Sequence, residues 1–153
     1  MDKKKSERLA PLLKLEQNRE QQKVKALGEA RSLVAVHAEK LQQLIEYRAE
    51  YELMVSQEGR QGIAASRLQG YHQFLNRLST AIAQQQEQLE LVQQKEQLAQ
   101  NKWFDQRGAV KRMDSLIERN VHQERKEEDS REQKMLDEQA QRLQRSRRPL
   151  GFN

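Results

Sequence analysis

The sequence predicts an all-α fold: two long helices that form an antiparallel coiled-coil hairpin, with the second helix overshooting the first. Three observations predict it. Apolar residues recur every seven positions, without a slip, from Leu68 to Ile117. Pro11 and Pro149 are the only prolines, so no obligate helix breaker lies between them. Hydrophobic residues make up 35% of the 153 residues and charged residues 33%, which suits a narrow seam better than a layered globular core.

The repeat in the C-terminal half of the chain has two tracks. Glu96 is the polar member of the first track, and Gln85 and Gln106 are the polar members of the second, three residues further on. The apolar members are Leu68, Leu75, Ile82, Leu89, Trp103, Val110 and Ile117 in the first track, and Tyr71, Leu78, Val92, Ala99 and Met113 in the second. A helix with this 3.5-residue period has to bury its seam against another helix, and the pair supercoils left-handed. A disordered chain of similar polarity lacks so sustained a repeat.

The N-terminal half carries heptads of its own. One track holds Leu13, Leu27, Val34, Leu41 and Val55, and the other holds Leu9, Ala30, Leu44 and Tyr51. Five polar residues occupy or interrupt these tracks: Glu16, Glu20, Lys23, His37 and Arg48. We expect a first helix over about residues 8–56, which begins close to Pro11 because proline is best tolerated in a first helical turn.

A loop over about residues 57–66 separates the helices, because two glycines three apart, Gly59 and Gly62, break the repeat there. Ser66 followed by Gln69 fits a capping box, so we expect a second helix over about residues 67–146. A basic C-terminal tail over about residues 147–153 completes a single coiled-coil domain, 1–153. Two helices joined by so short a loop fold back on each other as an antiparallel hairpin.

Two registers of this hairpin are open, with Tyr51 opposite either Leu75 or Leu68. In both, the first helix ends well before the second does. The apolar repeat also stops there, since no apolar residue occurs between Val121 and Met135. We therefore expect the C-terminal part of the second helix to overhang, either frayed or waiting for a partner. A short apolar stripe resumes within it: Met135, Leu136, Ala140 and Leu143.

Several classes of chemistry are excluded. The absence of cysteine excludes disulfides, thiolate metal sites and a cysteine nucleophile. His37, His72 and His122 are too scattered for a metal motif, and no phosphate-binding, nucleophile-elbow or dinucleotide-binding motif occurs. We expect no enzymatic activity, catalytic residue, metal or cofactor.

No stretch approaches the roughly 20 apolar residues that a membrane-spanning helix requires. The basic N-terminus has no apolar segment behind it, so it does not form a secretory signal. Together with the lack of cysteine, these features predict a reducing, cytoplasmic location.

The net charge of +5 is concentrated at the two ends of the chain. The basic residues there are Lys3, Lys4, Lys5, Arg8, Arg142, Arg145, Arg147 and Arg148. In a hairpin they come together at one tip, which would attract an acidic protein surface or an anionic membrane. Solubilising charge on frayed ends is the alternative. Elsewhere charges alternate in sign, without the dense basic block of a DNA-binding zipper, so we expect no nucleic-acid partner.

One edge of the second helix carries a stripe at i, i+4, i+7 and i+11: Phe74, Leu78, Ala81 and Gln85. Phe74 lies one position off the seam. A partly exposed apolar stripe on a polar rod is a candidate docking edge.

Short segments on both sides of the loop match a known pattern. They are Leu44-Ile45-Glu46-Tyr47 with Tyr51, Gly62-Ile63, Ser66-Arg67-Leu68 with Tyr71, Gln73-Phe74, Leu78 and Ala81-Ile82. Lys134-Met135, Asp137-Glu138 and Ala140-Gln141-Arg142 form a second, C-terminal group. In these segments the chain resembles FliJ, a family of small soluble components of the bacterial flagellar type III export apparatus. The resemblance is densest between residues 44 and 82 and covers most of the chain more loosely.

The resemblance implies a coiled coil similar to the rotor stalk of rotary ATPases, peripheral at the inner face of the cell membrane. The implied partners are the hexameric export ATPase FliI, whose pore would receive the basic ends, the export gate protein FlhA, and export chaperones. The family's gate-contact stripe maps onto Phe74, Leu78 and Ala81, with Gln85 where the best-known pattern has histidine. A generic coiled-coil adaptor or an injectisome ATPase stalk would share the rod and remains the alternative.

Overall fold

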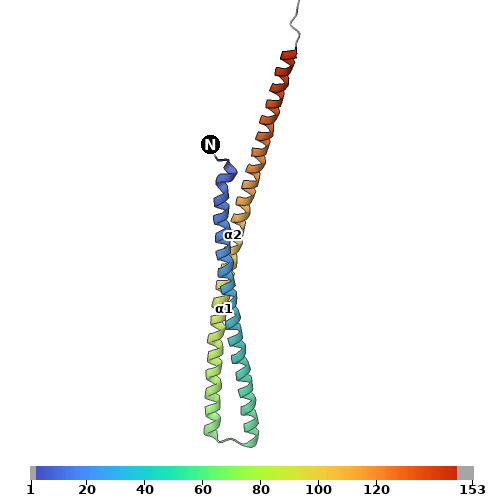
Figure 1. Ribbon diagram of the computed structural model, residues 1–153. Helices are drawn as coiled ribbons and strands as arrows, with labels where there is room; N and C mark the ends of the chain where they lie inside the picture. The colour runs from blue at the N-terminus through green and yellow to red at the C-terminus, as the bar shows by residue number, and fades with distance from the viewer. Residues whose placement is uncertain (1–2, 148–153) are drawn as a thin grey trace, which may run out of the picture. The chain divides into compact units, whose positions relative to one another are not determined.

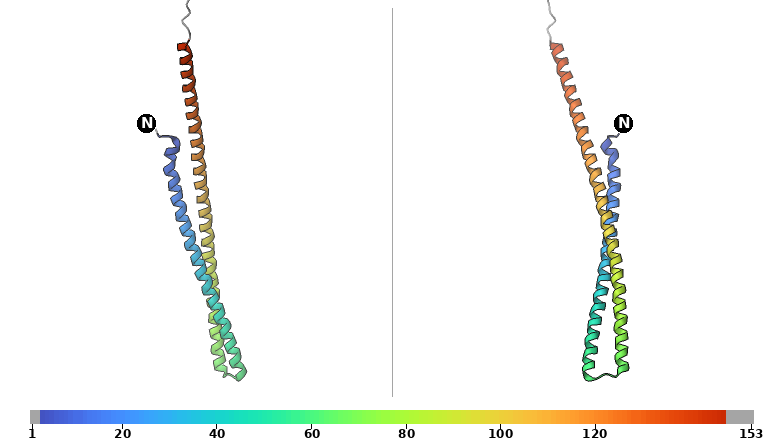
Figure 2. Two further views of the ribbon diagram at one scale, coloured as in Figure 1. Left: turned by 45° about the vertical axis from the view of Figure 1, so that its right-hand side comes forward. Right: turned by 180° about the vertical axis from the view of Figure 1, so that it is seen from behind.

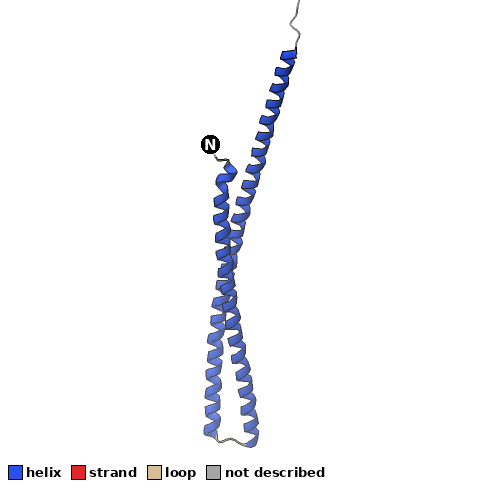
Figure 3. Ribbon diagram, viewed as in Figure 1, coloured by secondary structure: helices blue, strands red, loops and turns tan. Residues whose placement is uncertain are grey.

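The computed structural model describes residues 3–147, and they form two α-helices (Figure 1). Helix α1 spans Lys5–Gln61 with 57 residues, and helix α2 spans Ala65–Arg147 with 83 residues. Within the described range there is no strand (Figure 3). The predicted all-α fold with two long helices is therefore confirmed.

Contacts divide the chain into two compact units, each built from both helices. The first, which we call the loop unit, comprises residues 19–106 and includes the connection between α1 and α2. The second, the terminal unit, comprises the described residues up to Asn18 together with those from Arg107 onward. In the loop unit, α1 and α2 lie side by side in each view (Figure 2). The expected single domain is thus organised as two units.

Both helices begin earlier or end later than the sequence pattern indicates. Gly59 lies inside the last turn of α1, since one glycine costs a helix only about 1 kcal/mol. Gly62 ends α1, because its φ of 87° lies in the left-handed region and its N–H donates to the Gly59 carbonyl at 3.3 Å. In α2, the N–H groups of Arg67 and Leu68 donate to the Ala64 carbonyl, so Ser66 lies within the first turn instead of ahead of it.

The seam of the loop unit follows the predicted heptad tracks. Its most buried members are Leu27, Val55, Leu78 and Val92, with exposed fractions between 5% and 9%. The half-buried apolar members are Ala30, Val34, Leu41, Leu44 and Tyr51 on α1, and Tyr71, Leu75, Ile82, Leu89, Ala99 and Trp103 on α2. Leu68 is the exception at 38% exposed, because α1 ends at Gln61 and offers it only a last turn to pack against.

Polar seam residues find partners across the two helices. The Gln85 side-chain amide donates to the His37 carbonyl at 3.0 Å and lies 2.9 Å from His37 Nδ1. Arg48 Nε donates to Ser79 Oγ at 2.9 Å. Half-buried polar pairs of this kind add little stability, but they fix the register of a coiled coil.

The register follows from two of these cross-helix contacts. With Tyr51 opposite Leu75, Arg48 comes next to Ser79, which it contacts at 2.9 Å. The same alignment brings Arg31 next to Glu96, and their charged atoms are 3.6 Å apart. Placing Tyr51 opposite Leu68 would separate each pair by about two turns along the helix. The contacts therefore select the first of the two registers.

A seam this narrow makes single buried residues costly to truncate. We expect Leu78→Ala, at 7% exposure, to lower the free energy of unfolding by about 2–4 kcal/mol, because a buried leucine leaves a cavity. Leu91→Ala, on the same helix at 50% exposure, is the matched control and should change it by less than about 0.5 kcal/mol. Urea denaturation followed by circular dichroism measures both, and equal losses would contradict the assigned seam.

Candidate functional site

The predicted docking stripe lies where α2 meets α1 in the loop unit, and Phe74 is its first residue. The Phe74 ring is half-buried and packs edge-on against Tyr51 and Tyr47, with ring centroids 4.6 Å and 6.2 Å away. Tyr51 in turn packs against Tyr71 at 5.8 Å. Four aromatic rings from both helices therefore stabilise one edge of the hairpin near its loop.

The other three stripe residues differ in what they offer to a partner. Leu78 is buried at 7% exposure and belongs to the seam. Gln85 is half-buried, with its amide bound to His37 of α1. Ala81 is half-buried beside them. Phe74 and Ala81 thus contribute surface, whereas Leu78 and Gln85 hold the helices beneath it.

Tyr47 is a surface residue that the stripe prediction left out. Its ring is 49% exposed and contacts Phe74 from α1. A shallow groove of about 400 Å³ begins at its side, lined by Lys40, Gln43, Leu44, Tyr47 and Gln85. The sequence held a signal for it, since Tyr47 lies one position before the seam residue Arg48, as Phe74 lies one before Leu75.

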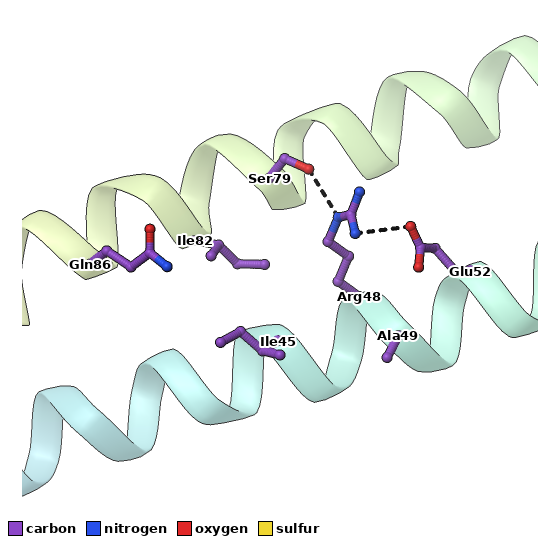
Figure 4. Close-up of a pocket in the computed structure, with 7 residues that line it drawn as sticks. All are labelled: Ile45, Arg48, Ala49, Glu52, Ser79, Ile82 and Gln86. Carbon is purple, nitrogen blue, oxygen red and sulfur yellow. Dashed lines mark hydrogen bonds and ion pairs between the residues drawn. The ribbon is translucent and has the colours of Figure 1, made fainter.

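A second groove, of about 390 Å³, follows the opposite edge of the same unit (Figure 4). Its lining residues are Ile45, Arg48, Ala49, Glu52, Ser79, Ile82 and Gln86. Figure 4 shows the Arg48 guanidinium between Ser79 and Glu52, and its Nη1 lies 2.9 Å from the Glu52 carboxylate. Arg48 of α1 links the two helices through its contact with Ser79 of α2. Apolar residues of the same groove, Ile45 and Ile82, lie next to it.

The loop end of the unit is held by Tyr71. Its phenol donates a hydrogen bond to the carboxylate of Glu58. The bond to Glu58 raises the pKa of Tyr71, with partial desolvation adding to the effect, so the phenol stays protonated and keeps donating. The Arg67 guanidinium lies 6.0 Å from the centre of the same ring. These contacts fix the last turn of α1 against the first turns of α2.

In the terminal unit, the basic residues form two separate groups. Lys3, Lys4, Lys5 and Arg8 are exposed at the start of α1, and the Lys4 ammonium lies 3.9 Å from the Glu128 carboxylate. Arg142 lies roughly 20 Å further along α2 than Glu128, at 1.5 Å per residue. The expectation that both basic groups meet at one tip is therefore not met, because α2 continues past the start of α1. Arg148 lies outside the described residues.

Glu124 of α2 caps the N-terminus of α1. Ser6 is buried, and its backbone N–H and its hydroxyl donate to the two carboxylate oxygens of Glu124, at 3.0 Å and 2.6 Å. First-turn N–H groups have no acceptor within their own helix, and a carboxylate is favoured at this positive end. This external cap allows α1 to begin at Lys5, ahead of Pro11, instead of at the proline.

Beyond Glu124, α2 continues as a helix without contacts that bury it. Every residue from Arg125 to Arg147 is exposed. The apolar members of this overhang include Met135 at 61%, Leu136 at 60% and Leu143 at 58%. The predicted overhang is thus a continuation of helix α2, and it presents both its apolar stripe and Arg142, Arg145 and Arg147.

Residues 3–147 hold neither a metal-binding cluster nor a membrane-spanning stretch. No group of three or more histidine, cysteine or carboxylate side chains in this range is placed to hold a metal ion. Within the same residues, neither helix has a stretch long and apolar enough to cross a membrane.

Comparison with known proteins identifies the family. The family model described as flagellar FliJ protein matches residues 4–149. The chain belongs to the FliJ family. Two similar relatives, both named flagellar FliJ protein, come from Escherichia coli K12 and Salmonella typhi. The first is 32% identical over 134 residues, covering 88% of this chain and 91% of the relative. The second is 34% identical over 116 residues, covering 76% and 79%.

No solved structure shows significant similarity to the chain. The FliJ family model nevertheless spans both the aromatic edge of the loop unit and most of the terminal unit. The resemblance first visible in the segments around the loop is therefore confirmed over nearly the whole length.

The Glu124 cap predicts a pH-dependent contribution to stability. Hydrogen bonds from the Ser6 hydroxyl and backbone N–H, together with the nearby Lys4, hold the pKa of Glu124 below its ordinary value of 4.5. Because the folded-state pKa is depressed, the contribution is present above pH 4.5 and is lost as the pH falls through the folded value.

We therefore expect Glu124→Gln to be less stable than the native protein at pH 7, with a difference that shrinks toward pH 3. Urea denaturation at the two pH values measures this. Glu132→Gln, at an exposed position on the same helix, is the control. A difference that stays constant with pH would show that the carboxylate charge at Glu124 is not the stabilising group.

Proposed function

We propose that this FliJ-family protein is a non-enzymatic component of the flagellar type III export apparatus that links the export ATPase FliI to the export gate protein FlhA. One observation carries the proposal: the continuous helix α2 presents two unlike surfaces, an aromatic edge in the loop unit and an exposed basic overhang in the terminal unit. A linker between two machines needs two such surfaces on one chain.

The overhang is the surface that suits the ATPase ring. It is a single exposed helix, so it can enter a ring's central pore without unfolding or separating from a partner helix. Arg142, Arg145 and Arg147 lie near its end, where no carboxylate follows Glu138. This local positive charge favours an acidic lining. A second basic group lies at the start of α1: Lys3, Lys4, Lys5 and Arg8. It would contact the same ring at a different height along the pore from the overhang.

The aromatic edge is the surface that suits the gate. Phe74 and Tyr47 supply partly exposed rings, which dominate binding at protein interfaces when a partner covers them. Ala81 leaves room beside them, while Leu78 and Gln85 support the edge from within. Residues at the gate contact would thus divide into those that touch the partner and those that position them.

The protein works in the cytoplasm and associates peripherally with the inner face of the membrane through the apparatus. Its exposed surface also leaves space for export chaperones to bind. FliJ-family membership favours the flagellar assignment over a generic adaptor or an injectisome stalk. Stimulation of ATP hydrolysis by purified FliI, on addition of the purified protein, is the direct functional test.

Removing the two partly exposed rings, Tyr47 and Phe74, tests the gate surface. We expect Tyr47→Ala combined with Phe74→Ala to weaken binding to the cytoplasmic part of FlhA at least tenfold, since both rings are candidate hot spots. Isothermal titration calorimetry measures the affinity. Ile45→Ala, at 40% exposure on the opposite edge, is the control and should leave it within twofold. Unchanged binding of the double variant would remove the aromatic edge from the gate contact.

Charge reversal tests the ATPase surface. Arg142→Glu, Arg145→Glu and Arg147→Glu together should weaken FliI binding strongly at low salt, because the attraction becomes repulsion. The difference from the native protein should shrink toward 1 M salt, where charges are screened beyond about 3 Å. Replacing the same three residues by glutamine should give an intermediate loss. A salt-independent effect in pull-downs would rule out an electrostatic contact.

A further inference from the structure

The aromatic edge of the loop unit continues along α1 beyond the predicted stripe. Leu33, Tyr47 and Met54 are whole heptads apart, so they lie in one line beside the seam, at 44%, 49% and 40% exposure. Val36, at 47%, lies three residues after Leu33 and seven before Gln43, which lines the groove beside Tyr47. Helix α1 therefore has a second apolar stripe in addition to its seam.

Helix α2 carries a matching stripe on the same side. Phe74 and Ala81 are one heptad apart and lie nearest to α1, and Leu91 and Leu98, at 50% and 54% exposure, lie further out. The contact between the Tyr47 and Phe74 rings shows that the two stripes share one edge of the hairpin. We call this surface the Tyr47 face. It comprises Leu33, Val36, Lys40, Tyr47 and Met54 of α1, and Phe74, Ala81, Leu91, Lys95, Leu98 and Lys102 of α2.

The opposite edge of the loop unit lacks such a surface. Exposed large apolar residues there are three: Val24 and Ile45 on α1, and Phe104 on α2 at 68% exposure. At the equivalent heptad positions α2 has polar residues: Ser79, Gln86, Gln93 and Gln100. Scattered exposed apolar residues are normal on any protein, but a one-sided set at heptad spacing marks an interaction surface.

The charged residues that lie next to the seam on the Tyr47 face are basic. Lys40 on α1 and Lys95 and Lys102 on α2 occupy the positions next to the seam on the Tyr47 face, and all three are exposed. Within residues 19–106, carboxylates on this side, such as Glu29 and Glu50, lie one row further out. A second copy of the chain placed face to face would bring like charges together, which disfavours self-association here.

We propose that the Tyr47 face seats one amphipathic α-helix from the cytoplasmic part of the export gate protein, with apolar residues at heptad spacing and acidic residues beside them. The seven-residue spacing of the face matches a helix and not an extended strand, whose side chains repeat every two residues. From Leu33 to Met54 the face is roughly 30 Å long, enough for a helix of about 20 residues. This inference rests on the proposed function for the identity of the partner.

Paired substitutions of equal chemistry on the two edges test the face. Val36→Glu and Val24→Glu compare valines of 47% and 50% exposure, the first on the Tyr47 face and the second on the opposite edge. Lys40→Glu and Lys25→Glu compare exposed lysines of the same helix, on and off the face. We expect Val36→Glu and Lys40→Glu to weaken binding to the cytoplasmic part of FlhA at least tenfold by calorimetry. Their controls should stay within twofold, and circular dichroism should show equal helicity.

Photo-cross-linking in cells tests the helical shape of the partner segment. A photoreactive residue at Leu33 or Leu98 should capture residues of the gate protein that are spaced three and four apart, and one at Val24 should capture none. Captured residues spaced two apart, or equal capture at Val24, would overturn the proposal.

Different results would contradict the proposed gate-binding function and the extended Tyr47 face. If Phe74→Ala weakens binding while Val36→Glu and Lys40→Glu do not, the extended face is wrong and the gate-binding function stands. If the native protein neither binds nor cross-links to the gate protein, the proposed function fails and this inference fails with it.

Discussion

The burial of one narrow seam between two helices is the interaction on which the rest of this structure depends. Its best-covered apolar residues are still 5% to 9% exposed, and within residues 3–147 no side chain is completely buried. Two positions in seven carry the packing, so the other five are left to solvent or to partners. The proposed binding surfaces are among those that the seam leaves uncovered.

The polar residues within the seam have a large influence on those surfaces. In the observed register His37 is hydrogen-bonded to Gln85, and Arg48 to Ser79. A shift of one helix by one heptad would separate the members of each pair and break these hydrogen bonds. The same register carries Tyr47 of α1 onto Phe74 of α2. Pairs that contribute little to stability thus decide which side chains share an edge, and the proposed docking surface follows from the register more than from either helix alone.

The two ends of the seam are closed in different ways. At the loop, Gly62 stops α1, and the Glu58–Tyr71 hydrogen bond holds its last turn. In the terminal unit, Glu124 accepts two hydrogen bonds from Ser6 and so marks where α1 starts. Helix α2 has no such limit and continues to Arg147. The exposed overhang is therefore a consequence of unequal helix lengths, and it separates the two basic groups that a simple hairpin would join.

The sequence by itself determined the helices, the seam and the overhang, because heptad periodicity is a property of each helix and needs no knowledge of its partner. The sequence also indicated the FliJ family, through the segments on both sides of the loop, and the family model confirms it. It placed the helix ends less well: Ser66 was taken for a cap, and the Glu124 cap joins residues far apart in the chain. Only the tertiary structure decided that Gln85 binds His37 and that Tyr47 packs on Phe74. These facts depend on how far one helix is shifted along the other, and a pattern that repeats every seven residues is compatible with more than one such shift.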